Sequence, residues 1–282
     1  MSKNPAYVII ILLFLADIFV FKSVLSSHDA LEVHFLNIGQ GDSALIRFPS
    51  GEDVLVDGGP PNGKILTELG KILPLEDRYI DLVISTHPDL DHFGGFIDVL
   101  DNYDIGAIIG NGRYGSATSF ETFLEKINKN GKKYITLKEG DTITLKNSKL
   151  DIISPNEEEF MGTATNDASI VFELESYGAK FLFTGDISSE VENRLVDENK
   201  VPDIDILKVA HHGSRFSSTA SFLDKIKPEI AVISVGKNSY GHPTEEAINR
   251  LSEEGSKILR TDYYGTIRTE VKNGHIFTFT ER

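Results

Sequence analysis

Four side chains that can bind a metal ion occur within six residues, in the segment His87-Pro88-Asp89-Leu90-Asp91-His92. The segment follows the apolar run 81–85, so the four side chains leave the end of an expected buried strand. Two carboxylates this close repel one another, and a buried carboxylate or imidazole must be paired or ligated. A bound dication removes that conflict. The pattern therefore predicts a metal site on a strand-to-helix turn, where the following glycines, 94 and 95, let the backbone bend.

Three further apolar runs end in aspartate or histidine, and in each case a glycine stands next to these residues. Each fragment alone also fits an ordinary turn, helix cap or histidine pair. Ligand sites in α/β proteins gather at such strand ends, so the four ends together outline a site for two metals. They supply Asp57, His87, Asp89, Asp91, His92, Asp186, His211 and His212.

Short β-rich runs alternate with helical stretches from residue 31 onward, which predicts one α/β domain over residues 28–282. The expected strands are 31–37, 43–48, 53–57, 82–86, 105–109, 133–136, 150–154, 169–176, 179–184, 206–210, 230–235, 258–261, 265–270 and 275–279. The expected helices are 64–73, 95–101, 119–129, 188–196, 219–226 and 244–254.

Composition limits the chemistry that the chain can carry. The 282 residues include no cysteine, which excludes disulfides, zinc–thiolate sites and a cysteine nucleophile, so metal ligands must be His, Asp or Glu. A formal net charge of -15 argues against a broad surface that coats DNA. It leaves room for a local cationic cleft, since bound dications are often the largest local charges in such a site.

Residues 1–27 form an expected membrane anchor or signal peptide. The stretch 6–21 is nearly continuously apolar, broken by Asp17 and closed by Lys22, and small residues follow it. An uncleaved anchor is favoured over a cleaved signal, because Asp17 lies toward one end of the stretch, where it can reach the membrane interface. The protein is therefore expected to be membrane-anchored with an extracytoplasmic domain, or else secreted.

An ordered series of motifs along nearly the whole exported part resembles a metallo-β-lactamase-fold hydrolase. More narrowly, it is similar to the hydrolase domain of ComEC-type DNA-uptake proteins and their stand-alone relatives. The motifs occupy residues 35–43, 56–59, 86–95, 166–171, 182–186, 207–214, 240–243 and 260–265. The resemblance implies an αββα sandwich, two mixed β-sheets flanked by helices, with a metal centre at one edge.

The resemblance also implies a ligand set for two divalent metal ions. Asp89 stands where the broad superfamily has a second histidine, and this change from imidazole to carboxylate makes manganese as suitable as zinc. Asp186 would be the bridging carboxylate. The superfamily's separate third-motif histidine is not visible, and Asn166 and Asp167 occupy that region. The implied ligands are His87, Asp89, Asp91, His92, Asp186 and His212.

Other roles follow from the same resemblance. Asp91 is expected to orient the attacking water or accept its proton, and Lys208 to offset charge on the phosphate oxygens. His242 is expected to act as a leaving-group acid or phosphate contact. Substrate contacts are expected from His211, itself an alternative metal ligand, and from Asn166. Asp42 and Asp57 are expected to orient ligands.

The function that fits best is a metal-dependent phosphodiesterase or nuclease outside the cytoplasmic membrane, with DNA during uptake as a candidate substrate. Import of DNA would need a separate permease as partner, because one membrane segment is expected here. One alternative is an exported phosphoesterase acting on cell-wall phosphocholine, teichoic acid or nucleotides, since a fold does not determine its substrate. Another is a non-catalytic metal-binding domain. A true β-lactamase is disfavoured by Asp89.

Overall fold

The computed structural model describes Phe14 and residues 30–282. Apart from Phe14, the predicted anchor or signal peptide lies outside this part of the chain. Within it, no helix has both the length and the apolar character needed to cross a membrane.

The described chain alternates strands and helices. The strands are β1 (Leu31–Phe35), β2 (Ala44–Arg47), β3 (Asp53–Val56), β4 (Tyr79–Ser85), β5 (Asp104–Gly110), β6 (Lys133–Thr136), β7 (Thr142–Leu145), β8 (Ser148–Ser154), β9 (Val171–Ser176), β10 (Ala179–Phe183), β11 (Ile206–Lys208), β12 (Ile230–Ile233), β13 (Lys257–Arg260), β14 (Ile267–Lys272) and β15 (His275–Thr280). The helices are α2 (Lys64–Ile72), α3 (Leu90–Phe93), α4 (Phe96–Asn102), α5 (Thr118–Lys129), α6 (Glu157–Met161), α7 (Ser189–Asp197), α8 (Ala220–Ile226), α9 (Glu245–Glu253) and α10 (Thr261–Tyr264), with 3₁₀ turns η1 (Asn166–Ala168) and η2 (Ala210–Gly213).

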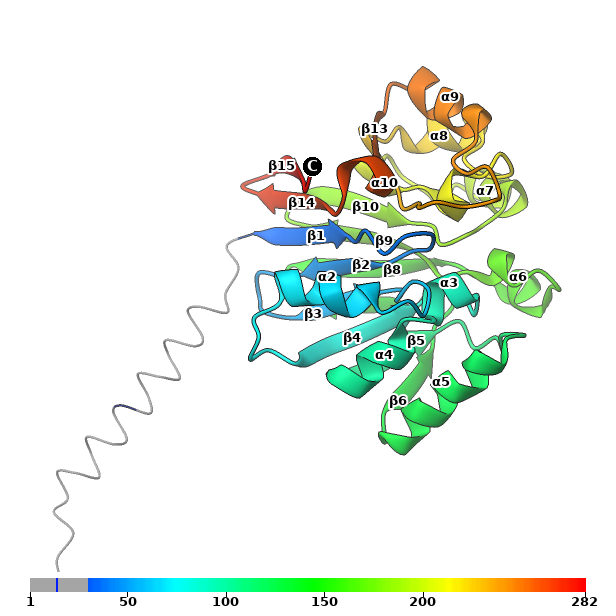
Figure 1. Ribbon diagram of the computed structural model, residues 1–282. Coiled ribbons are helices and arrows are strands. Elements are labelled where there is room, and N and C mark those ends of the chain that lie inside the picture. The colour runs from blue at the N-terminus through cyan, green and yellow to red at the C-terminus, as the bar shows by residue number, and fades with distance from the viewer. Residues whose placement is uncertain (1–13, 15–29) are drawn as a thin grey trace, which may run out of the picture.

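Two mixed β-sheets form the centre of the molecule (Figure 1). One has eight strands in the order β15-β14-β1-β2-β3-β4-β5-β6, and the other has seven in the order β13-β12-β11-β10-β9-β8-β7. Strands β3 to β6 are parallel in the first sheet, and β10 to β13 are parallel in the second. Ligand sites in α/β folds form at the carboxyl ends of parallel strands, so each sheet offers one such edge.

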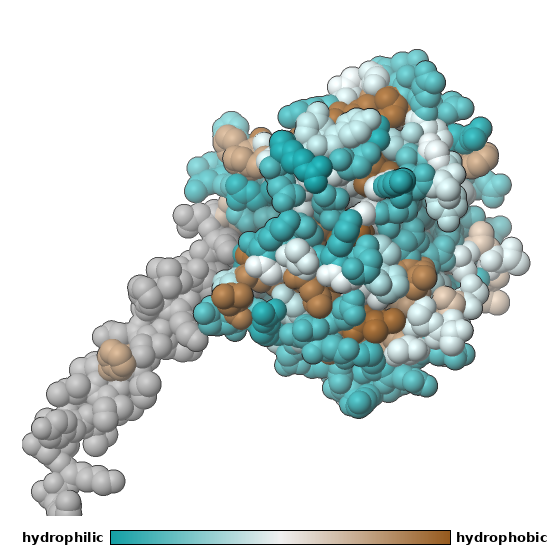
Figure 2. Space-filling view, in the orientation of Figure 1, coloured by the Kyte–Doolittle hydropathy of each residue, from teal (hydrophilic) through white to brown (hydrophobic). Residues whose placement is uncertain are grey.

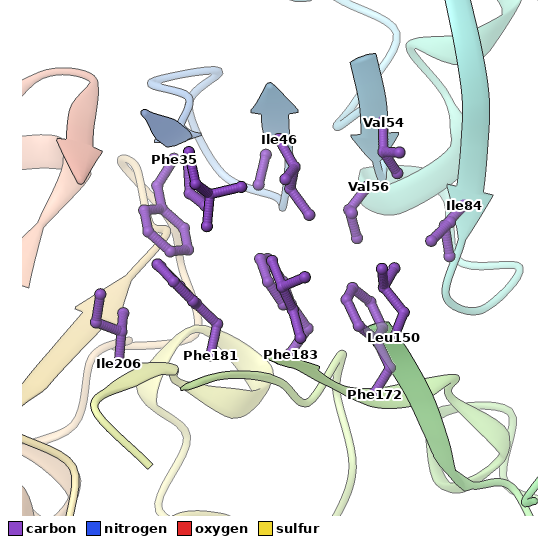
Figure 3. Close-up of a cluster of buried hydrophobic side chains, with 14 of the residues drawn as sticks. Phe35, Ile46, Val54, Val56, Ile84, Leu150, Phe172, Phe181, Phe183 and Ile206 are labelled. Carbon is purple, nitrogen blue, oxygen red and sulfur yellow. The ribbon is translucent and has the colours of Figure 1, made fainter. Parts of the chain in front are cut away.

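Apolar side chains from the facing sides of both sheets fill the space between them (Figure 3). The Phe172 and Phe183 rings stack with centroids 4.7 Å apart, and Phe35 lies 6.0 Å from Phe183. Alternate residues of a strand point to opposite faces of its sheet. One half of the strand residues therefore faces the other sheet, and the other half packs against the helices. The labelled core residues are Phe35, Ile46, Val54, Val56, Ile84, Leu150, Phe172, Phe181, Phe183 and Ile206.

Helices cover the outer face of each sheet, which confirms the predicted αββα sandwich (Figure 1). In α5 the buried residues Phe120, Phe123 and Ile127 recur at helical spacing and pack with α2 and α4 over the first sheet. Helices α7, α8 and α9 cover the second sheet in the same way. The face shown in Figure 2 is mainly hydrophilic, with separate hydrophobic patches, as the strong negative charge leads one to expect.

Each predicted strand and helix has a counterpart in the structure, and four short elements were not predicted. Strand β7 lies at a sheet edge with alternately half-buried side chains, and α3, α6 and α10 span four or five residues each. Elements this short contain too few apolar residues to show a period. Among them α3 matters most, because it carries Asp91 and His92.

Candidate metal centre

Both sheets contribute side chains to the predicted site. Asp57 follows β3 and His87 follows β4 in the first sheet, while Asp186 follows β10 and His212 follows β11 in the second. The four side chains are between 1% and 4% exposed. Segments 99 to 155 residues apart in sequence therefore meet at one edge of the sandwich, at the carboxyl ends of their strands.

Helix α3 presents the rest of the first motif. The Gly58 amide donates to the His92 carbonyl at 2.6 Å, which ties α3 to the turn after β3. A Cβ at Gly95 would lie 2.1 Å from the Gly58 carbonyl oxygen, so only glycine permits this close approach. The two glycines thus hold His92 in the site.

The metal-binding atoms converge from three histidines and two aspartates. His92 Nε2 lies 3.3 Å from Asp186 Oδ2, and His212 Nε2 lies 3.3 Å from Asp91 Oδ2 and 3.7 Å from Asp186 Oδ2. Four overlapping groups of three described residues have donor atoms within 4.8 Å of one another. Two consist of predicted ligands, namely His87, His92 and Asp186, and Asp91, His92 and His212. The other two include Asp42, either with Asp186 and His212 or with Asp57 and His92.

The inward-facing atoms of this cluster lie close to one another but make no hydrogen bond among the described residues. His87 Nε2, His92 Nε2, His212 Nε2 and Asp186 Oδ1 are buried without a hydrogen bond among the described residues. Burying such atoms is costly unless a ligand satisfies them. Imidazole nitrogens and carboxylate oxygens are the donors that divalent metals use, so the residues present fit such ions.

The opposite ring nitrogens are all occupied, which fixes the tautomers. His92 Nδ1 lies 2.9 Å from Asp57 Oδ2, and His212 Nδ1 lies 2.9 Å from the Ser234 carbonyl oxygen. The Thr86 hydroxyl donates to Asp57 at 2.8 Å and therefore accepts from His87 Nδ1 at 3.0 Å. In the neutral form of each imidazole, Nδ1 carries the proton and the Nε2 lone pair faces the centre of the cluster.

Electrostatics in the cluster favour added positive charge. Burial lowers the pKa of His87 to about 4, with His92 adding to the effect, so this imidazole is neutral. Burial also acts to lower the pKa of His212, but Asp186 and Asp42 raise it to about 10. Burial acts to raise the pKa of Asp186, yet His92 and His212 hold it well below its usual range. Metal ions would replace the protons that these histidines otherwise supply.

Asp57 and Asp42 lie behind the histidines, where they were predicted to orient ligands. Asp57 contacts His92 as described, and Asp42 Oδ1 lies 3.1 Å from His212 Nδ1. Lys208 is 5% exposed, and its ammonium donates to Asp42 Oδ2 and to the Val209 carbonyl oxygen. Its predicted role in offsetting phosphate charge stays a prediction, because these contacts hold it behind His212.

Four other predicted residues lie at the open side of the cluster. The Asp89 side chain is 42% exposed, lies 3.9 Å from His87 Nε2 and belongs to none of the four groups above. The Thr165 hydroxyl oxygen lies 3.3 Å from Asp89 Oδ1 and 3.4 Å from Asn166 Oδ1, so it links these two side chains. His211 Nε2 is 3.9 Å from Asp186 Oδ2, and the His242 ring lies 5.5 Å from the His211 ring. These positions suit groups that meet a substrate.

Three residues of the cluster adopt the left-handed backbone conformation. The φ angles are 53° at Asp57, 50° at His211 and 54° at His212. For residues other than glycine this conformation costs of order 1–3 kcal/mol each, and such strain collects at functional sites. The local backbone is therefore held in place by its surroundings.

Sequence reasoning missed three supporting groups. Thr86 stands directly before His87, and its hydroxyl next to a ligand was the available signal. Thr165 precedes Asn166 and offered a weaker signal of the same kind. The Ser234 carbonyl oxygen offered none, because any residue has this group and it lies 22 residues from His212.

Comparison with known proteins agrees with this geometry. Residues 36–237 match the family model described as the metallo-beta-lactamase superfamily. The chain is 31% identical over 261 residues to ComE operon protein 3 of Bacillus subtilis (strain 168), covering 86% of this chain and 33% of that protein. It is 29% identical over 242 residues to competence protein ComA of Neisseria gonorrhoeae, covering 84% and 32%. The chain thus spans about a third of the length of these relatives.

Solved structures show the same fold. The metallo-beta-lactamase fold protein YhfI from Bacillus subtilis superposes with a TM-score of 0.57 at 13% identity, covering 89% of this chain and all (100%) of that one. A putative metal-dependent hydrolase from Parabacteroides distasonis has a TM-score of 0.52 at 18% identity, with coverage of 82% and 92%. The curated relatives are ComEC-like competence proteins, as the motifs indicated. The chain belongs to the metallo-beta-lactamase superfamily, whose fold binds divalent metals and supports metal-dependent hydrolysis.

Proposed function

We propose that the chain is a metal-dependent phosphodiesterase, and more narrowly a nuclease, that acts outside the cytoplasmic membrane. The observation that carries this proposal is the cluster of unpartnered histidine nitrogens and carboxylate oxygens at one edge of the sandwich. Carboxylates form a large part of the donor set, which suits the hard metals used in phosphoryl chemistry. The relatives named as competence proteins favour nucleic acid as substrate.

Two divalent ions, zinc or manganese, are the proposed cofactors. His87, His92 and Asp186 would hold one ion, with Asp89 beside them, and Asp91 and His212 would hold the other, with Asp186 shared. When bound, such ions lower the pKa of water toward neutrality and offset the charge that develops on phosphate oxygens.

Asp91 is the proposed proton acceptor. Its side chain is 37% exposed, so it reaches the open side, while Oδ2 stays 3.3 Å from His212 Nε2. Burial acts to raise the pKa of Asp91, but the close contact with His212 and the nearby His92 lower it below its usual value. An ionised carboxylate in this place can orient a water molecule and hold its proton. His211 and His242 are proposed to contact the phosphoryl oxygens or the leaving group.

A substrate screen with defined metals tests the proposal. The purified chain, stripped with chelator and reloaded with manganese or zinc, is expected to cleave bis(p-nitrophenyl) phosphate and single-stranded DNA. Absence of turnover with both metals on both substrates would contradict it. Cleavage of phosphocholine esters without cleavage of DNA would move the assignment to a cell-wall phosphoesterase.

The proposed location rests on the apolar stretch 6–21. We propose that it anchors or exports the hydrolase domain, and that a separate permease carries any DNA across the membrane. Sequencing the mature N-terminus separates the two forms, since a start near residue 27 indicates secretion. Protease digestion of intact cells should remove an anchored domain, and full protection would contradict the extracytoplasmic location.

A further inference from the structure

The loop after β12 is closed by a single side chain. Asn238 Nδ2 donates to the carbonyl oxygens of Gly236 at 2.9 Å and His242 at 2.8 Å. Asn238 Oδ1 accepts from the amides of Tyr240 and His242, both at 3.1 Å. The loop is therefore set before any substrate arrives, which lowers the entropy cost of binding.

This loop presents an aromatic ring beside the metal centre. Tyr240 is 73% exposed, and its ring centroid lies 5.9 Å from that of His242. The His242 ring lies 5.5 Å from His211, whose Nε2 is 3.9 Å from Asp186 Oδ2. A row of three rings thus runs from solvent to a proposed metal ligand.

The neighbouring loop presents a second aromatic ring. Phe216 is 69% exposed and follows the His211–Gly213 turn. Its amide donates to Ser214 Oγ at 3.2 Å, and its carbonyl oxygen accepts from the Ser189 amide at 2.8 Å. The Arg215 guanidinium carbon lies 5.7 Å from the Phe216 ring centroid. Phe216 therefore has a fixed backbone and a cation beside it.

Exposed aromatic rings next to a phosphodiesterase centre can bind bases. Base–aromatic stacking is tolerant of sequence and contributes about 5- to 100-fold per base to affinity. The net charge of -15 opposes binding through many phosphates. Stacking on a protein ring requires an unpaired base, so double-stranded nucleic acid does not fit this surface.

We propose that Tyr240 and Phe216 stack on bases next to the scissile phosphate, and that the substrate is a single-stranded polynucleotide held mainly by its bases. This inference rests on the proposed phosphodiesterase function. It assigns substrate specificity to two residues outside the ligand set.

The test compares two oligomers of equal length and phosphate number. One is oligodeoxythymidine, and the other is an abasic phosphodiester chain. The manganese-loaded full chain is expected to show a KM about tenfold or more lower for the base-bearing oligomer. Tyr240→Leu should reduce that preference by about 5- to 100-fold, Tyr240→Phe should retain it, and Phe216→Leu should also reduce it.

Tyr177 provides a matched control. It is 42% exposed in the turn between β9 and β10, at the end of β10 away from Asp186. Tyr177→Leu is expected to leave the preference between the two oligomers unchanged.

Binding without metal supplies a readout that does not depend on turnover. Fluorescence anisotropy of dye-labelled oligodeoxythymidine on the metal-free full chain should show tighter binding than the abasic oligomer, and Tyr240→Leu and Phe216→Leu should each reduce the difference. The binding constant should depend only weakly on salt concentration. A slope of about -0.7 in a plot of log binding constant against log salt concentration corresponds to about one neutralised phosphate on a single strand.

The outcomes separate this inference from the proposed function. Equal cleavage and equal binding of both oligomers, unaffected by Tyr240→Leu and Phe216→Leu, would overturn base stacking and leave the phosphodiesterase intact. Failure to cleave either oligomer, with the binding difference present, would contradict the phosphodiesterase and support the stacking surface. A steep salt slope with no base preference would also overturn stacking.

Discussion

At the scale of single residues, Asp57 and Asp91 show how the burial of a side chain gives two carboxylates of one cluster different roles. Asp57 is 2% exposed, and its oxygens accept from the Thr86 amide and hydroxyl and face His92 Nδ1. The Asp91 side chain is 37% exposed and reaches the open side. Asp57 can therefore act only through its neighbours His92 and Thr86, whereas Asp91 can contact water and substrate directly.

Asp91→Ala is expected to lower kcat by about 100-fold or more, because it removes a metal ligand and a proton acceptor together. The rate is measured on bis(p-nitrophenyl) phosphate at saturating metal. Asp203→Ala is the matched control, since Asp203 is exposed and precedes β11 at the end away from the site. Full activity in the Asp91 variant would show that the centre is misplaced.

Asp57→Asn should weaken metal binding by about 10- to 100-fold, a cost typical of removing a group that orients a ligating histidine. The amide nitrogen would place a donor against the Thr86 donors or against His92 Nδ1. Competition with a chromophoric chelator measures the affinity, and Asp203→Asn serves as control. An unchanged affinity would count against the orienting role.

The sequence made part of this site predictable. The ligands of the first motif are neighbours in the chain, so their spacing alone indicated a metal. The side chain of Lys208 points toward Asp42, and this could not be predicted, because the two residues are 166 positions apart in sequence. The same holds for the Ser234 carbonyl oxygen, a group without a sequence signal.

At the scale of elements, a buried carboxylate joins α7 to the start of α8. Glu192 is 0% exposed, and its oxygens accept from the amides of Ser218 at 2.5 Å and Thr219 at 2.8 Å. Thr219 caps α8 by accepting from the Phe222 amide. One side chain thus sets the spacing between two helices that cover the second sheet.

Burial raises the pKa of Glu192 to about 7, although the amides of Thr219 and Ser218 act to lower it. The folded pKa exceeds the unfolded value of 4.5, so the stability from this group is fully present below pH 4.5 and is lost as the pH rises through 7. Glu192→Gln does not titrate. Wild type should therefore lose stability relative to Glu192→Gln as the pH rises. The difference between their free energies of unfolding should fall by about 3 kcal/mol between pH 4.5 and 8.

Urea denaturation at several pH values measures this difference. Glu190→Gln on the exposed side of the same helix should track wild type at every pH. A difference between wild type and Glu192→Gln that is constant with pH would show that the carboxyl titrates normally in the folded protein.

Element prediction succeeded where apolar residues repeat over several positions, as in α5, with its buried Phe120, Phe123 and Ile127. It failed for β7, an edge strand of four residues whose side chains are all at least partly exposed. It also failed for α3, whose existence depends on the turn held by Gly58 and Gly95 and not on its own period.

At the scale of the whole molecule, the centre draws on both sheets. His87 and His92 belong to the first sheet and its following helix, while Asp186 and His212 follow strands of the second. The order of strands in the sheets could not be predicted from the residues alone, because pairing between distant segments leaves no local pattern. The sandwich was predicted through the resemblance of its motifs.

Metal ions bound here should act as a cross-link between the two sheets and stabilise the folded protein. At a metal concentration 100 times Kd the gain is about 2.7 kcal/mol, or roughly 5–10 °C in Tm for a chain of this size. Differential scanning fluorimetry with manganese or zinc measures the shift, and chelator should reverse it. His87→Ala should show a smaller shift and the exposed His275→Ala the full shift. A Tm insensitive to metal would contradict binding at this edge.

The left-handed conformation of His211 and His212 has a consequence for attempts to improve this protein. Glycine adopts this conformation without steric cost, so these positions hold residues that a selection for thermal stability alone would replace. Such a selection would enrich chains that fold well and have lost their chemistry. A library screened for both properties should instead retain histidine here and gain its stability elsewhere.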